Sequence, residues 1–153
     1  MKHSLLILSA AAIISSCDHK ELIMPSPDQE EMVPMELTMS TGIPTKALVK
    51  GTRLPDPSSV GITVRDSYGA YTGDAYTNVQ YTSRDESGKQ VWESDSPVML
   101  STQSGTVYSY YPYADGIKDI TSIPVRANST VQTDFLWGTP VSASRDNRTA
   151  SII

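Results

Sequence analysis

The chain has 153 residues and a formal charge of −5, with acidic and basic residues interspersed along it. No stretch gathers the lysines and arginines that attract phosphates, so nucleic-acid binding is not expected. The length suffices for one domain with a sizeable core, and the single cysteine excludes an internal disulfide. Abundant Ser and Thr, with Pro and Gly at short intervals, favour many short strands joined by turns.

Residues 1–17 have the character of a targeting segment. The apolar run 5–14 is shorter than the roughly 20 residues that a spanning helix needs, and it has the length of a signal-peptide apolar region. The run ends Ile14-Ser15-Ser16-Cys17, which resembles the bacterial lipobox. The resemblance implies cleavage before Cys17 and a diacylglycerol on its thiol. A free or buried thiol that happens to follow the apolar run is the alternative.

Residues 18–33 mix charges with Pro25 and Pro27 and show no sustained period. This composition predicts a flexible tether between the lipid and a folded domain at residues 34–153.

The first strand of that domain is expected at residues 35–40. Apolar and polar residues alternate there, so Met35, Leu37 and Met39 share one face of a half-buried strand. Residues 41–59 then form a connection rich in Pro and Gly. Its basic residues would be accessible to a trypsin-like protease, although an ordinary surface loop is the simpler interpretation; they are Lys46, Lys50 and Arg53.

Short strands are expected next at residues 60–64 and 78–82, where β-branched residues are frequent. Ser87-Gly88 is a hairpin-turn signal, and residues 91–92 return from that turn.

The stretch 96–116 is expected to lie at the centre of a β-sandwich. Its two apolar runs, 98–100 and 107–111, flank a polar segment and predict a β-hairpin with a long loop. Pro112 ends the second run because proline cannot donate a ladder hydrogen bond.

The later segments predict smaller elements. Residues 117–120 and 123–125 suggest brief strands, with Pro124 at a sheet edge or bulge. Residues 133–138 suggest a compact apolar plug. Residues 150–153 resemble the beginning of another strand, which suggests that the domain is incomplete at its C-terminus.

No catalytic constellation is evident in the expected domain. The two histidines, His3 and His19, both precede it, which excludes a histidine-activated nucleophile and a His-ligated zinc site. There is no Gly-rich phosphate loop. Many carboxylates could form a glycosidase pair or a calcium site, but their spacing favours solvated loop acids. We therefore expect no enzyme, no metal and no cofactor.

Aromatic residues offer a second kind of site. Six aromatic residues are candidates for a surface on which sugar rings stack, because aromatic rings are large, rigid and amphipathic. They are Trp92, Tyr108, Tyr110, Tyr111, Tyr113 and Trp137, of which Trp92, Tyr110 and Tyr113 are preferred. Core and sheet-surface packing is the alternative.

The order of these features resembles the fimbrillin-like (Mfa-like) lipoproteins of the Bacteroidetes, subunits of type V pili. The resemblance covers nearly all of the chain after the signal. It depends on the lipobox, the first strand, the basic loop and five short motifs. These are S-V-G-I-T-V (59–64), K-Q-V-W-E with Trp92 (89–93), S-P-V-M-L (96–100), Y-S-Y-Y-P-Y (108–113) and Q-T-D-F-L-W-G (132–138). The tyrosine-proline run followed by the Asp-aromatic segment is its most specific part.

The resemblance implies an all-β fold, a transthyretin-like β-sandwich of which residues 34–153 would be the N-terminal part. It implies a lipid-anchored protein exposed on the outer membrane or in the fimbrium, with other fimbrial subunits as partners and adhesion to host or bacterial surfaces as the outcome. A protease would remove the first strand, by cleavage after Arg53 in preference to Lys50 or Lys46, and a neighbouring chain would replace it by strand addition. A non-polymerising surface lipoprotein that binds glycans or host ligands is the alternative function.

Overall fold

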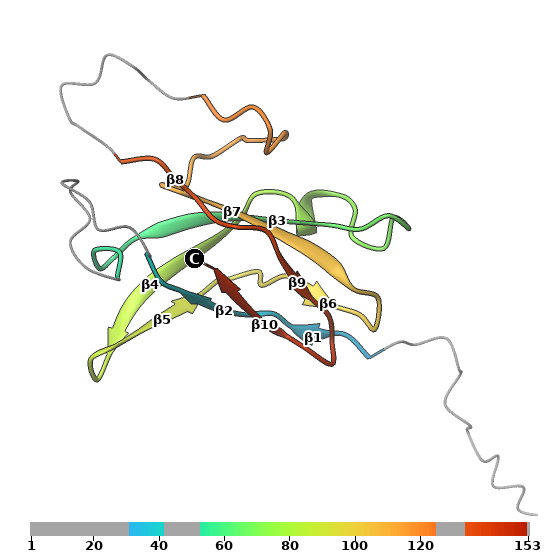
Figure 1. Ribbon diagram of the computed structural model, residues 1–153, viewed down its shortest axis with the longest axis horizontal. Helices are drawn as coiled ribbons and strands as arrows, with labels where there is room; N and C mark the ends of the chain where they lie inside the picture. The colour runs from blue at the N-terminus through green and yellow to red at the C-terminus, as the bar shows by residue number, and fades with distance from the viewer. Residues whose placement is uncertain (1–30, 42–52, 125–133, 153) are drawn as a thin grey trace, which may run out of the picture.

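The computed structural model describes residues 31–41, 53–124 and 134–152, and nearly all of its regular structure is β-strand (Figure 1). No α-helix occurs in these ranges, so the expected all-β class is confirmed. The elements are β1 (Val33–Pro34), β2 (Glu36–Met39), β3 (Ser59–Arg65), the 3-10 turn η1 (Asp74–Tyr76), β4 (Val79–Glu86), β5 (Lys89–Glu93), β6 (Met99–Leu100), β7 (Gly105–Tyr111), β8 (Leu136–Trp137), β9 (Val141–Ala143) and β10 (Thr149–Ile152).

The main sheet has six antiparallel strands in the order β5-β4-β3-β7-β8, and β9 also pairs with β7. Its centre is β3, where Ile62 lies opposite Val79 of β4 and Ser109 of β7. β8 and β9 follow one another along the same edge of β7. β3 is buried along its middle five residues because β-branched side chains pack on both of its faces.

The remaining strands form a second layer, drawn below β3 and β7 in Figure 1. β1 pairs with β6 in antiparallel fashion, and β2 pairs with β10 in parallel fashion. The two layers enclose one core, which makes the fold sandwich-like. The fully buried large side chains include Tyr71, Tyr81, Ile62, Leu100, Val60, Val64, Val98 and Val107.

The hairpin predicted for residues 96–116 is wrong, although both of its runs are strands. β6 pairs with β1 in the second layer, whereas β7 pairs with β3 in the main sheet. Both runs are largely buried, so the apolar residues of each run are removed from water in a different layer. Tyr71 fixes the crossover between them: its buried hydroxyl accepts the Ser101 N–H at 3.1 Å and donates to the Gln103 carbonyl.

Other predictions have mixed outcomes. The Ser87-Gly88 turn is confirmed, with positive φ at both residues, and it joins β4 to β5. No strand occurs at residues 117–124, where the chain is irregular apart from a turn at 120–121; residue 125 of the second predicted strand lies outside the described residues. Residues 134–138 are not a buried plug, since Phe135 and Trp137 are 42% and 53% exposed. The strand expected at 150–153 is confirmed as β10.

Candidate functional site

The first strand has hydrogen-bonded neighbours on both of its edges. The Met35 N–H donates to the Val98 carbonyl at 2.8 Å, on the β6 side. The next N–H, that of Glu36, donates to the Arg148 carbonyl at 2.9 Å, on the β10 side. Residues 33–40 therefore lie between β6 and β10 and complete the second layer.

One face of this strand fills the core. Met35 and Leu37 are only 4% and 6% exposed, and Met39 is half-buried, which confirms the predicted alternation. Burying each of the first two side chains contributes about 1.5–3 kcal/mol. Removal of the strand would uncover buried neighbours such as Leu100 and Ala150 and would leave backbone groups of β6 and β10 without partners.

The outer face of the strand is polar, and its side chains contact β10 and the residue just before β10. Glu36 forms an ion pair with Arg148 at 2.8 Å, and the Thr38 Oγ1 donates to the Ser151 Oγ at 3.0 Å. These groups are exposed, so each contact contributes at most about 1 kcal/mol. The apolar face and the backbone ladder therefore hold the strand in place.

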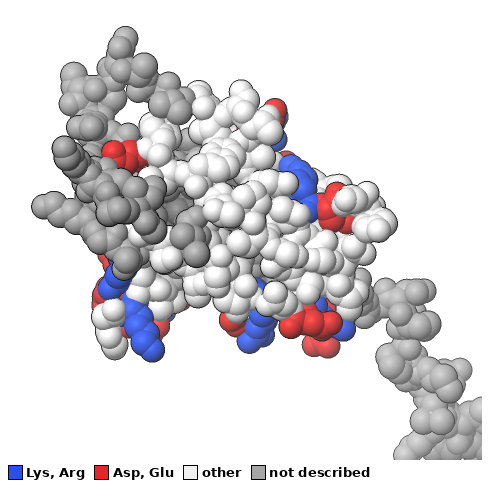
Figure 2. Space-filling view, viewed as in Figure 1, with Lys and Arg blue, Asp and Glu red and all other residues white. Residues whose placement is uncertain are grey.

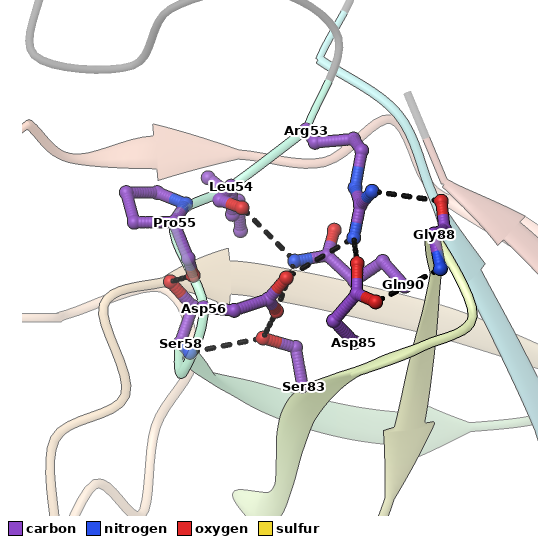
Figure 3. Close-up of polar contacts among 9 residues, drawn as sticks. All are labelled: Arg53, Leu54, Pro55, Asp56, Ser58, Ser83, Asp85, Gly88 and Gln90. Carbon is purple, nitrogen blue, oxygen red and sulfur yellow. Dashed lines mark hydrogen bonds and ion pairs between the residues drawn. The ribbon is translucent and has the colours of Figure 1, made fainter.

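Arg53, the preferred processing residue, lies in a polar cluster on the β4–β5 hairpin (Figure 3). Its Nη1 donates to the Gly88 carbonyl at 3.0 Å, and its Nη2 contacts Asp85 at 3.0 Å and Asp56 at 3.1 Å. We call this group of four residues the Arg53 clamp. It joins the start of the 53–58 segment to a hairpin more than 30 residues away in sequence.

The chain just after Arg53 is also fixed. Leu54 is 4% exposed, and its carbonyl accepts a hydrogen bond from Gln90 Nε2 at 2.9 Å. The Ser58 N–H donates to Ser83 Oγ at 2.9 Å, and the Ser58 hydroxyl donates to the Pro55 carbonyl. Figure 3 shows these contacts grouped beneath the Arg53 side chain. The segment is therefore part of the folded domain.

Two carboxyl groups of the clamp favour their charged forms. Hydrogen bonds from the Ser83 hydroxyl and Gln90 amide lower the pKa of Asp56, and the nearby Arg53 guanidinium adds to this. The Gly88 N–H, followed by the Arg53 guanidinium, lowers the pKa of Asp85. Both groups are thus anionic partners for Arg53 at neutral pH.

Several predicted residues lie outside the described ranges. These are the lipidation residue Cys17 and the processing candidates Lys46 and Lys50, so the structure brings none of them to a site. Most of the predicted tether, 18–33, lies outside as well.

The aromatic candidates are not gathered on one surface. Trp92 and Tyr110 are 6% and 2% exposed, so neither presents a ring face to a ligand. The Tyr110 hydroxyl donates to Asn78 at 2.6 Å and receives the Ala114 N–H at 3.2 Å, which is a structural role. Tyr113 is half-buried beside its own turn.

One of the candidates, Trp137, is exposed, together with Phe135, which was not among them. Trp137 lies in the edge strand β8 and Phe135 lies just before that strand. The Trp137 ring stacks on Tyr110 with centroids 6.3 Å apart. Phe135 and Trp137 border a hollow of about 230 Å³ that also touches Ile120 and Ile123. Alternation in the D-F-L-W stretch was the signal that could have grouped Phe135 with Trp137.

Charged residues are mixed in sign. In Figure 2 the centre of the visible face is largely uncharged, and red and blue side chains lie side by side around its rim. Arg84, for example, forms ion pairs with both Glu93 and Glu86. Within the described ranges, no three His, Cys, Asp or Glu side chains are placed to share a metal ion. The same ranges hold no helix that is long and apolar enough to cross a membrane.

No family model matches the chain, and no curated protein matches it.

Proposed function

We propose that the protein is a structural subunit or anchor component of a cell-surface fimbria, assembled by protease-triggered strand addition. The observation that supports this most is the position of the first strand. Its backbone bonds to β6 on one edge and to β10 on the other, while Met35 and Leu37 fill the core. A strand in this position can be replaced by strand addition, because another extended chain could make the same backbone and core contacts.

The assembly step follows from this geometry. A cut in the connection after the first strand, at Arg53, Lys50 or Lys46, would separate residues 33–40 from the rest of the domain. The strand could then leave, and a segment of a neighbouring subunit could enter between β6 and β10. The incoming segment would need apolar residues at alternate positions, to replace Met35, Leu37 and Met39.

The remaining parts of the proposal come from the sequence. A transthyretin-like sandwich would be exported with the 1–17 signal and anchored in the outer membrane through a lipid on Cys17, where multiple acyl chains give lasting attachment. Its partners would be other fimbrial subunits, and the assembled fimbria would support adhesion to host or bacterial surfaces. The proposed role is structural and requires neither catalysis nor a cofactor.

The test is to remove all three basic residues of the connection together. In cells that assemble the protein, Lys46→Ala, Lys50→Ala and Arg53→Ala should abolish processing and the ladder of polymers on unboiled gels. The matched control changes three basic residues elsewhere, Lys89→Ala, Lys118→Ala and Arg145→Ala, and should leave the ladder intact. An unchanged ladder in the first variant would rule out protease-triggered assembly.

A second candidate function is glycan binding by a surface lipoprotein that does not polymerise. The exposed Phe135 and Trp137 rings beside the 230 Å³ hollow favour it, because sugar rings stack on such surfaces. Sugar-dependent quenching of tryptophan fluorescence that disappears in Trp137→Ala, with Trp92 still present, would support this function. Quenching that persists in the variant would exclude a site at β8.

A further inference from the structure

We propose that the Arg53–Leu54 bond is a latent processing site, which the Arg53 clamp keeps closed in the folded protein. This inference rests on the proposed function for its biological purpose, but its physical basis is the clamp alone. Cleavage would then depend on the accessibility of the bond in the folded protein as well as on recognition of arginine by the protease.

A trypsin-like protease must take the guanidinium into its own acidic pocket. In the folded protein that guanidinium already has two carboxylates and a carbonyl as partners, each at 3.0–3.1 Å. The protease pocket and the clamp would therefore compete for the same group. Although the Arg53 side chain is 38% exposed, its charged end is occupied.

The residues after the bond add a second obstacle. Cleavage needs a chain that can be drawn out locally, and exposed, weakly bonded segments are the ones that proteases cut. Leu54 is buried, its carbonyl is held by Gln90, and the Ser58 N–H is held by Ser83. Binding to a protease would break these contacts together, so the bond becomes accessible only when the segment opens.

The rate of cleavage after Arg53 should therefore increase when the Arg53 clamp opens more often. Asp85 is the residue through which this can be tested, because its side chain is 49% exposed and it bonds to Arg53 from the neighbouring hairpin. Asp56 is less suitable, since it also accepts bonds from Ser83 and Gln90 and helps to hold the segment's fold.

The experiment is a time course of trypsin digestion of the purified full chain under native conditions. Mass spectrometry would measure the fragment that begins at Leu54. A synthetic peptide of residues 49–60 gives the rate for the same bond without the fold. We expect native cleavage at least about tenfold slower than cleavage of the peptide, because the open state is a minor population. Equal rates in chain and peptide would overturn the proposal.

The variant Asp85→Asn should speed cleavage after Arg53 by about one and a half to fivefold, the range that corresponds to loss of an exposed ion pair. The control Glu86→Gln removes the same charge from the adjacent residue, which pairs with Arg84, and should leave the rate unchanged. Equal rates in the two variants would contradict a role for the clamp. Circular dichroism would show whether each variant remains folded at the assay temperature.

A second variant covers the case in which Asp85→Asn unfolds. Gln90→Met removes the bond to the Leu54 carbonyl while keeping the length of the side chain, and it should also speed cleavage after Arg53. No change in that variant would contradict the proposal. These rates require no polymer, so a protein that shows the clamp effect but never assembles would overturn the proposed function alone.

Discussion

The centre of the main sheet and the first strand are both buried, but they are held in different ways. β3 pairs with β4 over four residues and with β7 over five, in antiparallel ladders. The first strand pairs with β6 over two residues through β1 and with β10 over four through β2. The main sheet is therefore a continuous ladder, whereas the first strand is held by two short and separate pairings.

From this difference we infer which part of the molecule opens first. β3 and its two neighbours, β4 and β7, all lie within residues 59–111. In contrast, Thr38 of β2 and its partner Ser151 of β10 are 113 residues apart in sequence. The first strand has six paired positions in all and β3 has nine, and elements with fewer backbone pairings and buried contacts open at a lower free energy. Loss of the first strand should therefore leave the main sheet in place, as replacement by another chain requires.

The largest expected effect lies at the centre of the main sheet. Ile62→Ala should lower the free energy of unfolding by about 2–5 kcal/mol, because it leaves a cavity in the fully buried core. Urea denaturation followed by circular dichroism measures this change. A loss below about 1 kcal/mol would contradict the central place given to β3.

A smaller effect is expected in the first strand. Leu37→Ala should lower the free energy of unfolding by about 2–3 kcal/mol, at the low end of the range for such truncations, because this layer can relax more easily. Hydrogen exchange should show the amides of Met35 and Glu36 losing protection in the variant while that of Ile62 keeps it. Equal loss of protection at all three amides would mean that the two regions open as one unit.

The exposed aromatic pair should matter less to stability. Trp137→Ala removes a side chain that is half exposed and one ring contact with Tyr110, so we expect a loss of about 0.5–1 kcal/mol. The measurement is again urea denaturation, with Tyr68→Ala, a more exposed aromatic residue, as the control. A loss as large as that of Ile62→Ala would show that β8 belongs to the core.

The smallest effect concerns the clamp and its pH dependence. The pKa values of Asp56 and Asp85 are lowered in the folded state, so the stability that they contribute is present above the ordinary aspartate pKa of about 3.9. It is lost as the pH falls through the lowered pKa values. Carboxyl NMR titration should show both midpoints below the ordinary value.

Arg53→Gln should then raise the pKa of Asp85 part of the way, since the Gly88 N–H remains. The pKa of Asp56 should change less, because Ser83 and Gln90 are its main partners. Identical pKa shifts at the two carboxyl groups would contradict the different dependence of Asp56 and Asp85 on Arg53.

The sequence predicts the local elements of this fold well. Alternation placed Met35 and Leu37 on the inner face of the first strand, Ser87-Gly88 marked the one hairpin that was placed correctly, and Pro112 marked the end of β7. Each of these signals comes from neighbours in the chain, through backbone geometry or period.

The partners of these elements could not be predicted in the same way. The runs 98–100 and 107–111 looked like a hairpin because each is apolar, but nothing local says that they belong to different layers. The Arg53 clamp was missed for the same reason, since Asp85 and Gly88 lie 32 and 35 residues away in sequence. The sequence identified Arg53 as a basic residue of the connection, but it did not reveal the contacts that Arg53 makes in the fold.

A reversible covalent lock on the first strand would show whether this strand must leave its place for assembly. Thr38 and Ser151 are Cα partners across β2 and β10, and their hydroxyls are hydrogen-bonded, so the two side chains face each other. Thr38→Cys together with Ser151→Cys would therefore place two thiols where a disulfide can form. With the disulfide formed, we expect normal processing but no polymers, and polymers should return on reduction. Each single cysteine variant should polymerise in both conditions. Polymers formed equally well by the locked protein would show that assembly does not require the first strand to leave.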